Sequence, residues 1–333
     1  MTSSLTQDAS GAPDPGWERS LEQHRRELTG YCYRMLGAGS EAEDAVQETM
    51  LRAWRGYGAF EGRASLRSWL YRIATNVCLD MHRSPQRRAR PMALGPSVRT
   101  AEAVLEEKLA EERWILPVLD RDVIDLTADP ADVAAARDSV RLAFVAALQH
   151  LPPRQRATLI LCEVLRWSAA EVAELLDTSV ASVNSALQRA RATLAERREE
   201  PLDPLDPLAD PAHQELLARY VDAFERYDIA RLVTLLRDDV VLSMPPWNMW
   251  IQGPDDVAAW LLGQGSGCRG SRVVPIEVSG TAGFGSYRMT RPGLWEPFAI
   301  QVIEVAGGRI TGHHNFLYPE RFADYDLPER LEG

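Results

Sequence analysis

The stretch SLRSWLYRIATNVCLDMHR, residues 65–83, has the spacing of a helix with two distinct faces. At about 100° per residue, one stripe is apolar and predicts a core contact, and its members are Leu66, Leu70, Ile73 and Val77. The neighbouring face carries Trp69, Arg72, Asn76, Asp80 and Arg83. An aromatic ring, cations and an amide suit a surface that binds bases and phosphates. The same residues are also compatible with an ordinary solvated face that has an Asp80–Arg83 ion pair. The segment alone does not distinguish a nucleic-acid-binding face from a solvated one.

The bulk composition indicates a globular protein of two or three domains. The chain has 333 residues, of which 45% are hydrophobic and 26% charged. It contains no run of about 18 apolar residues, and the start MTSSLTQDASGAPDPGW lacks the basic and apolar parts of a secretory signal. The four cysteines are scattered without a CxxC pair, so we expect no zinc site, no other metal and no cofactor. These features predict a cytoplasmic protein with no membrane contact.

The net charge of −11 is unevenly distributed along the chain. Residues 52–90 contain nine arginines and two acids, whereas residues 102–138 contain eleven acids and four bases. From residue 201 onward, nineteen acids face eleven bases. One segment can therefore attract phosphate while the others repel it, and the isolated protein should bind free DNA poorly.

The pattern along the chain predicts three blocks of different architecture. Helical periodicity covers 17–90, an acidic linker covers 91–139, and a second helical module covers 140–198. The Pro-rich segment 199–212 is expected to be a stiff spacer, with few contacts between the parts of the chain before and after it. In 213–330, helices at about 213–226, 229–237 and 255–262 come before or between β-rich segments, which indicates an α+β domain.

The segment SAAEVAELLDTSVASVNSALQRARATL, residues 168–194, has helix-turn-helix spacing. Its second helix carries Val183, Leu187, Ala190 and Leu194 on one face. The outward face would present short polar groups, an amide and cations that can read a major groove: Ser182, Asn184, Ser185, Gln188, Arg189 and Arg191. An ordinary helical hairpin is the alternative.

The segment EAEDAVQETMLRAW, residues 41–54, predicts a helix with an apolar arc that ends at Trp54. Leu51 lies on the opposite face, beside Asp44, Gln47 and Glu48. A leucine among acids on an exposed face suggests docking to a basic partner helix, although isolated exposed leucines are common.

Four motifs, in this order and at these separations, resemble an extracytoplasmic-function (ECF) sigma factor of the sigma-70 family of bacterial RNA polymerase: EDAVQETMLRAW, FEGRASLRSWLYRIATNVCLD, LPPRQRATLIL and SAAEVAELLDTSVASVNSALQRARATL. The resemblance covers residues 17–198. It implies that the first module is the region 2 helical bundle and the second is the region 4 helix-turn-helix. It also implies a protein that binds core polymerase, recognises −10 and −35 promoter elements and starts transcription.

The resemblance assigns three sets of contact residues. Those for the −10 element, including a captured flipped base, would be Phe60, Arg63, Ser65, Trp69, Arg72, Asn76 and Arg83. Those for the −35 element would be Ser182, Asn184, Ser185, Gln188, Arg189 and Arg191. Those for the β′ clamp coiled coil of the polymerase would be Asp44, Gln47, Glu48 and Leu51. Region 4 would also sit on the β flap tip, and the acidic linker is similar to the segment that threads the polymerase toward its RNA channel.

Two departures from the family pattern limit these expectations. Many members carry a basic pair in the recognition helix where this chain has Asn184 and Ala186, so the −35 sequence preference is not predicted. The linker is also long for the family.

The last block resembles the SnoaL-like group of cone-shaped α+β domains, through LLARYVDAFERYDIARLVTLLRDDVVLSMPPW, GPDDVAAWL and the trailing strands. Such cones enclose a pocket, and we expect a small ligand near Trp247, Trp250 and His314. Further candidate polar groups are Asp239, Tyr287, His313 and Asn315, but no catalytic residue is assigned, because a fold alone does not imply chemistry. In sigma factors with such extensions, the resemblance implies regulation in cis by the C-terminal domain.

Two other functions remain open from the sequence. One is a one-component regulator in which the cone senses a ligand and the helix-turn-helix binds an operator. The other is a cone-domain enzyme with a DNA-binding module.

Overall fold

The computed structural model describes residues 15–60, 65–81, 88–102, 105, 108–197 and 203–333. The chain divides into two compact units. The first, here the helical unit, comprises residues 1–85, 122–127 and 147–198, and the second, here the sheet unit, comprises residues 86–121, 128–146 and 199–333. Within the described ranges, no helix combines the length and the apolar character needed to cross a bilayer.

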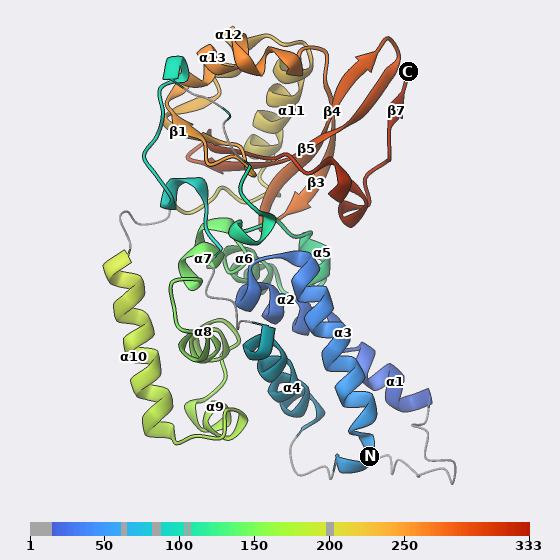
Figure 1. Ribbon diagram of the computed structural model, residues 1–333, viewed down its shortest axis with the longest axis vertical. Coiled ribbons are helices and arrows are strands. Elements are labelled where there is room, and N and C mark those ends of the chain that lie inside the picture. The colour runs from blue at the N-terminus through green and yellow to red at the C-terminus, as the bar shows by residue number, and fades with distance from the viewer. Residues whose placement is uncertain (1–14, 61–64, 82–87, 103–104, 106–107, 198–202) are drawn as a thin grey trace. The chain divides into compact units, whose positions relative to one another are not determined.

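The helical unit is built from amphipathic helices that pack on one another (Figure 1). They are α1 (Pro15–Glu22), α2 (Arg25–Leu36), α3 (Gly39–Arg55), α4 (Leu66–Met81), α8 (Pro153–Leu159), α9 (Ala169–Leu175) and α10 (Val180–Arg197). A π turn, Ile160–Val164, continues α8. Gly37 ends α2 in a left-handed conformation with φ of 85°, which glycine adopts without steric cost.

Aromatic and hydroxyl groups fix α2 against α4 in the core of this unit. The Tyr31 hydroxyl lies 2.8 Å from the Thr75 hydroxyl, and the rings of Tyr31 and Tyr71 meet edge-on with centroids 5.2 Å apart. All three side chains are buried. The predicted apolar stripe of α4 is present, with Leu70 and Val77 buried.

The helix-turn-helix forms where the sequence predicts it. Ser168 caps α9 through a capping box, in which its hydroxyl accepts from the Glu171 amide and the Glu171 carboxylate accepts from the Ser168 amide. The turn to α10 contains Asp177 with φ of 50°, and the Ser182 amide donates to the Ser179 hydroxyl at 3.2 Å. Local capping therefore sets both helix starts.

The sheet unit has a seven-stranded sheet with the path β2-β1-β6-β5-β4-β3, and β7 pairs with β5. The strands are β1 (Leu236–Ser243), β2 (Trp250–Gln252), β3 (Arg272–Val278), β4 (Thr281–Arg291), β5 (Leu294–Ala306), β6 (Arg309–Phe316) and β7 (Leu331–Glu332). The β1–β6 pair is parallel and the other pairs are antiparallel. The helices α11 (Pro211–Glu225), α12 (Ile229–Val233) and α13 (Pro254–Leu262) pack on the sheet (Figure 1).

The helix expected at 229–237 is shorter than predicted. It ends at Val233, and β1 begins at Leu236. The apolar residues of this segment fit a helical face as well as a strand face, so the sequence pattern could not separate them. Parallel pairing with β6, a contact distant in sequence, decides for the strand.

The acidic linker packs on the sheet unit. The Val98 amide donates to the Trp250 carbonyl at 3.0 Å, and the Leu109 amide donates to the Pro246 carbonyl at 3.0 Å. Leu119 forms an isolated antiparallel β-bridge with Val278. Helix α6 (Pro130–Asp138) belongs to this unit, whereas α5 (Asp120–Val123) and α7 (Leu142–Leu148) have residues in both units.

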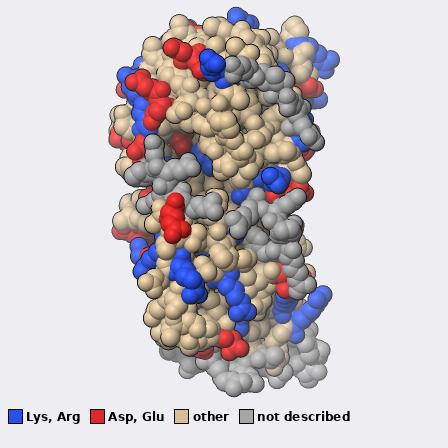
Figure 2. Space-filling view, turned by 60° about the vertical axis from the view of Figure 1, so that its left-hand side comes forward, with Lys and Arg blue, Asp and Glu red and all other residues tan. Residues whose placement is uncertain are grey.

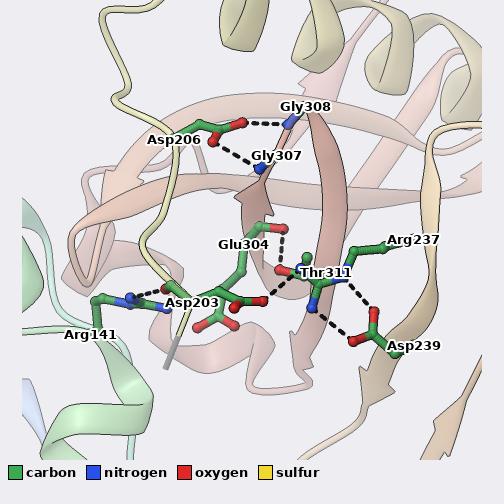
Figure 3. Close-up of polar contacts among 9 residues, drawn as sticks. All are labelled: Arg141, Asp203, Asp206, Arg237, Asp239, Glu304, Gly307, Gly308 and Thr311. Atoms are coloured by element: carbon green, nitrogen blue, oxygen red, sulfur yellow. Dashed lines mark hydrogen bonds and ion pairs between the residues drawn. The ribbon is translucent and has the colours of Figure 1, made fainter. Parts of the chain in front are cut away.

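The described part of the Pro-rich spacer, residues 203–212, also contacts the sheet of this unit. Figure 3 shows the Asp206 carboxylate accepting from the amides of Gly307 and Gly308, at 2.9 and 2.7 Å. Both glycines have positive φ, 61° and 71°, which lets their amides converge on one carboxylate. Asp203 pairs with Arg237 at 2.6 Å. The PLD repeats thus act as a docking segment, which their proline content alone does not reveal.

Candidate functional sites

The predicted −10 surface begins with an aromatic cluster at the start of α4. Trp69 is half-buried, with its ring centroid 5.2 Å from Phe60 and 6.1 Å from the buried Trp17. Ser65 is exposed, and its hydroxyl accepts from the Ser68 amide at 3.1 Å, which caps the helix. Two of the predicted −10 residues, Arg63 and Arg83, lie outside the described residues.

Arg72 and Asn76 are exposed on the next turns of α4, as the periodicity predicts. The Arg72 guanidinium donates to the Glu174 carbonyl of α9 at 3.0 Å. A cavity of about 520 Å³ lies between these helices and is lined by Arg72, Asn76, Leu79, Arg154 and Glu174–Asp177. Asp80 is 3.6 Å from Arg52, a partner on α3 that the α4 sequence does not show. The −10 face therefore contacts the helix-turn-helix within the helical unit.

The predicted −35 residues share the outer face of α10. All six are exposed: Ser182, Asn184, Ser185, Gln188, Arg189 and Arg191. Arg191 forms an ion pair with Glu163, so it lies nearer the flank of the helix. Val183 and Ala190, on the opposite face, are buried. Figure 2 shows Lys and Arg side chains standing out on the lower half of the face that carries this helix.

The predicted polymerase-docking residues lie on the outer face of α3. Asp44 and Gln47 are exposed, Leu51 is 44% exposed, and Glu48 pairs with Arg52 at 2.7 Å. Trp54, expected at the end of the apolar arc, is 39% exposed instead. It lies three residues from Leu51, so it enlarges the apolar part of this face beyond what the periodicity predicts.

The sheet unit encloses a cavity of about 220 Å³. Trp247 lines it, as expected, but Trp250 and His314 do not. The Trp250 indole instead donates to the Gly95 carbonyl at 2.9 Å, under the linker. His313 and Asn315 line the cavity, together with Gln301, which the sequence did not suggest. Of the three residues expected near a ligand, one therefore lines this cavity and two do not.

The two histidines differ in position because side chains alternate between the two faces of β6. Adjacent side chains on a strand point to opposite faces, so His313 and His314 cannot share one cavity. Both histidines are buried because β6 lies inside the sheet. His313 lines the cavity, and His314 contacts Arg90, the residue before the linker. Neither histidine faces solvent.

The other candidate acid–base groups lie apart from the cavity. Asp239 pairs with Arg237, and the Tyr287 hydroxyl donates to the Pro328 carbonyl at 2.8 Å. Among the described residues that line the cavity, none is a carboxylate. The described part of the chain also contains no cluster of His, Cys, Asp and Glu suited to a metal ion.

A buried ionic cluster joins the linker to β5 and β6. The Arg90 guanidinium is 2.9 Å from Nε2 of His314, and that nitrogen is 3.7 Å from the Glu304 carboxylate. Because a guanidinium can only donate, Nε2 must accept and the proton resides on Nδ1, which is 2.8 Å from the Ser243 hydroxyl. Burial and the charge of Arg90 lower the pKa of His314, in agreement with a neutral ring.

Glu304 is the negative partner in this cluster. Burial alone would raise the pKa of Glu304, but hydrogen bonding to His314 and the charges of Arg90 and Arg141 hold that pKa well below its ordinary value. Since His314 is neutral, we attribute the lowering of the Glu304 pKa chiefly to the two arginines. Arg141 also donates to the Asp203 carbonyl of the spacer at 2.8 Å (Figure 3). The negative charge of Glu304 therefore interacts with Arg90 before the linker and with Arg141 after it.

Three family models match the chain. They are Sigma-70 region 2 over residues 21–88, Sigma-70 region 4 over residues 141–194, and a SnoaL-like domain over residues 217–313. With the exposed faces of α3, α4 and α10, these matches define the class as a sigma factor with a SnoaL-like extension. The chain belongs to the ECF family of RNA polymerase sigma factors, which are transcription initiation factors.

Two relatives from Mycobacterium tuberculosis are similar over nearly the whole chain. The ECF sigma factor SigG is 43% identical over 313 residues, which are 93% of this chain and 83% of SigG. The ECF sigma factor SigJ is 29% identical over 327 residues, 93% of this chain and 94% of SigJ. The crystal structure of SigJ matches with a TM-score of 0.58 at 26% identity and covers 94% of this chain and 99% of that structure. The expected fold class, two helical sigma modules followed by an α+β SnoaL-like domain, is confirmed.

Proposed function

We propose that the predicted residue sets act as the family resemblance implies. The outer face of α3, with Leu51 and Trp54, docks on the β′ clamp of the polymerase, and region 4 sits on the β flap. The α4 face with Trp69, Arg72 and Asn76 opens and holds the −10 element, and α10 reads the −35 element. Exposure of Leu51, Trp54, Arg72, Asn76 and the polar residues of α10 in the described structure supports the assignment.

The contact between Arg72 and the Glu174 carbonyl supports weak DNA binding by the free chain. A guanidinium that donates to a protein carbonyl must give up that bond before it binds a phosphate. This adds a short-range reason to the long-range repulsion from the acidic blocks. Binding of core polymerase would release α4 and α9 from one another.

We further propose that the SnoaL-like domain regulates the sigma regions in cis through the linker. The observation that carries this proposal is that two arginines on either side of the linker contact the sheet unit. Arg90, two residues after the region 2 match, is 2.9 Å from Nε2 of His314, and that nitrogen is 3.7 Å from the Glu304 carboxylate. Arg141, the first residue of the region 4 match, donates to the Asp203 carbonyl at 2.8 Å. By fixing both ends of the linker on one domain, the cluster sets how far apart those ends can be. We expect this bracing to be required for full activity.

The test is run-off transcription with purified core polymerase on genomic promoters. Glu304→Gln keeps the shape of the side chain and removes its charge, and Glu296→Gln is the matched control, since Glu296 is an exposed residue of the same strand. We expect Glu304→Gln to lower transcription and Glu296→Gln to leave it unchanged. Equal activity of both variants would reject regulation through this cluster, and higher activity of Glu304→Gln would mean that the domain masks the sigma regions.

Deletion of the C-terminal domain is a less specific test. The linker and α6 pack on the sheet unit, so truncation near residue 200 also removes their support. New start sites with the full chain and core polymerase would separate the sigma assignment from a one-component regulator. Tight binding of the free full chain to a specific promoter at physiological salt, without new start sites, would favour the latter.

A further inference from the structure

The acidic linker is divided between the two units. Residues 86–121 and 128–146 belong to the sheet unit, whereas residues 122–127, here called the plug, belong to the helical unit. Val123 and Ile124 are 5% and 2% exposed, although Asp122 and Asp125 flank them. Burial of two adjacent apolar side chains between acids indicates a specific contact and not a solvated tether.

The plug contacts α2 of region 2. A Cβ atom added at Gly30 would lie 2.7 Å from the Val123 carbonyl oxygen, so this close approach of the linker backbone requires glycine. Glycine is a poor helix former, and the contact explains its place in the middle of α2. Four residues earlier on the same face, Nη1 of Arg26 is 3.5 Å from the Asp125 carboxylate. We call the α2 surface around Arg26 and Gly30 the socket.

Local hydrogen bonds fix the acidic end of the plug. The Asp125 carboxylate accepts from the Thr127 hydroxyl at 2.7 Å and from the Thr127 amide at 3.1 Å. These bonds, together with the charge of Arg26, lower the pKa of Asp125. The carboxylate is therefore ionised at physiological pH, and the plug combines an apolar contact with one charge pair.

A docked plug shortens the connection between the two sigma regions. The region 4 match begins at residue 141, so only residues 128–140 connect it to a plug that is docked on region 2. Those residues span at most about 45 Å when fully extended, and about 30 Å while α6 keeps its rise of about 1.5 Å per residue. The whole linker, residues 91–139, could span more than about 150 Å.

Promoter contacts require a longer connection. The −10 and −35 elements lie about 25 base pairs apart, which is about 85 Å at about 3.4 Å per base pair. Modules of the size of the two matched regions have radii of about 14 Å, so a gap of about 55 Å remains between them. Residues 128–140 cannot bridge this gap while the plug stays on α2. Release of the contact between Arg72 and Glu174 alone is therefore not sufficient.

We infer that the plug occupies the socket on α2 in the free chain and must leave it before regions 2 and 4 contact the −10 and −35 elements of one promoter. The inference rests on the proposed promoter contacts of α4 and α10. It assigns to α2 an interaction surface whose occupant is a segment of the same chain. Polymerase binding must supply the free energy that displaces the plug, so a weaker plug should allow the sigma factor to act at lower concentration.

The test fixes the plug in the socket by a covalent bond. Lys108 is the only lysine in the sequence, so Arg26→Lys adds a second lysine side chain, placed next to the Asp125 carboxylate. A water-soluble carbodiimide couples this amine to the carboxylate as an amide, and mass spectrometry of the digested chain measures the coupled fraction. We expect coupling in the free full chain, and we expect run-off transcription with core polymerase to fall in proportion to the coupled fraction.

The matched control carries Arg26→Lys together with Asp125→Asn and receives the same carbodiimide. It has the same amine and the same other carboxylates, but an amide at position 125 cannot couple, so it should keep its transcription. Absence of coupling between positions 26 and 125 in the free chain would overturn the inference. Equal transcription by the coupled chain and the treated control would also overturn it.

Substitutions in the plug test the inference in the opposite direction. Ile124→Asn removes a buried aliphatic side chain, whereas Leu126→Asn makes a similar change at a residue of the plug that is 41% exposed. Because polymerase then has less to displace, Ile124→Asn should reach half-maximal transcription at about 10-fold lower sigma concentration than Leu126→Asn. Equal concentrations for the two variants would reject displacement of the plug.

The coupling measurement is independent of transcription, so two failures can be told apart. If the uncoupled chain gives no promoter-specific transcript with core polymerase, the proposed function is rejected and the inferred release with it, although coupling would still show that the plug docks. If the uncoupled chain transcribes and coupling has no effect, the proposed function stands and the inference is rejected.

Discussion

Substitution of Glu304 by glutamine should destabilise the sheet unit by about 3 kcal/mol, because it removes the negative charge that offsets Arg90 and Arg141 in a largely buried cluster. The Glu304 side chain is 13% exposed and that of His314 2%, so solvent screens the cluster only weakly. Arg141 is also buried, at 7% exposure. The neutral His314 cannot replace the lost negative charge. The destabilisation should therefore lie near the lower end of the range for breaking a buried ion pair, since Arg90 is only half-buried.

Native-state hydrogen exchange with mass spectrometry is the appropriate assay, because a chain of two units need not unfold in one step. A loss of about 3 kcal/mol raises the opening constant of the β5 and β6 amides by about 100-fold. Peptides from α2 and α3 in the helical unit serve as an internal reference. Glu296→Gln should change the protection of β5 and β6 by less than about 0.5 kcal/mol.

A double-mutant cycle with Arg90→Met separates the charge pair from general disruption. If the unpaired guanidinium causes the loss, Arg90→Met should cost less in the Glu304→Gln background than in the wild type, or even restore stability. Protection of β6 that is equal in Glu304→Gln and Glu296→Gln would refute the reasoning. Additive effects of Glu304→Gln and Arg90→Met would show that the two side chains do not act on one another.

Three other predictions address the remaining surfaces. Leu51→Asp should reduce core-polymerase affinity at least about 10-fold by placing a charge in an apolar contact. Leu262→Asp, at an exposed leucine of α13 in the sheet unit, should not, and fluorescence anisotropy with labelled sigma measures both. Asn76→Ala should lower permanganate reactivity of the −10 thymines at unchanged core affinity, and undiminished melting would contradict the base-capture role. Trp69→Ala would also disturb packing, because the Trp69 ring contacts the buried Trp17. Because the folded-state pKa of His313 is lowered to about 3, the unfolded chain takes up the proton first as pH falls below about 6.5. Urea unfolding should therefore show about 1.4 kcal/mol less stability at pH 5.5 than at pH 7.5 from this residue, and an identical pH difference in His313→Phe would contradict it.

Much of the helical unit could be predicted from local sequence signals. The periodicity of residues 65–83 places Leu70 and Val77 inside and Arg72 and Asn76 outside, and the structure agrees. The helix-turn-helix and the break at Gly37 follow from spacing, capping and backbone preferences within a few residues. Such signals act over one or two helical turns, so they can be recognised without knowing the partner elements.

The exposure of Trp54 shows that helical periodicity does not predict the burial of every apolar residue. Helical periodicity places it on the apolar arc of α3, but at the end of that helix it remains 39% exposed. A helical wheel gives the direction of a side chain and not whether another element covers it. The covering element is a property of the fold.

The candidate site of the C-terminal domain shows the same limit more strongly. Its domain type followed from the order of helices and strands, and Trp247 was placed correctly at the cavity. His313 and His314 could not be assigned to their faces, because a shift of one residue in register exchanges inside and outside. Gln301 gave no signal, since its role depends on Tyr220 at a distance of 81 residues along the chain.

The sequence by itself determined the order of the three blocks, the periodic faces of the helices and the uneven distribution of charge. Only the tertiary structure decided that the linker and the spacer dock on the SnoaL-like domain. The acidic composition of the linker and the Pro-rich composition of the spacer both indicate solvated segments. Whether a charged residue is buried depends on the charges around it as well as on its own charge. Arg90, the residue before the linker, is stabilised in the sheet unit because Glu304 supplies the opposite charge inside the fold. The two residues are more than 200 positions apart along the chain. Pairing at such a separation has no local signature, whereas a helix of the sigma regions has one in every turn.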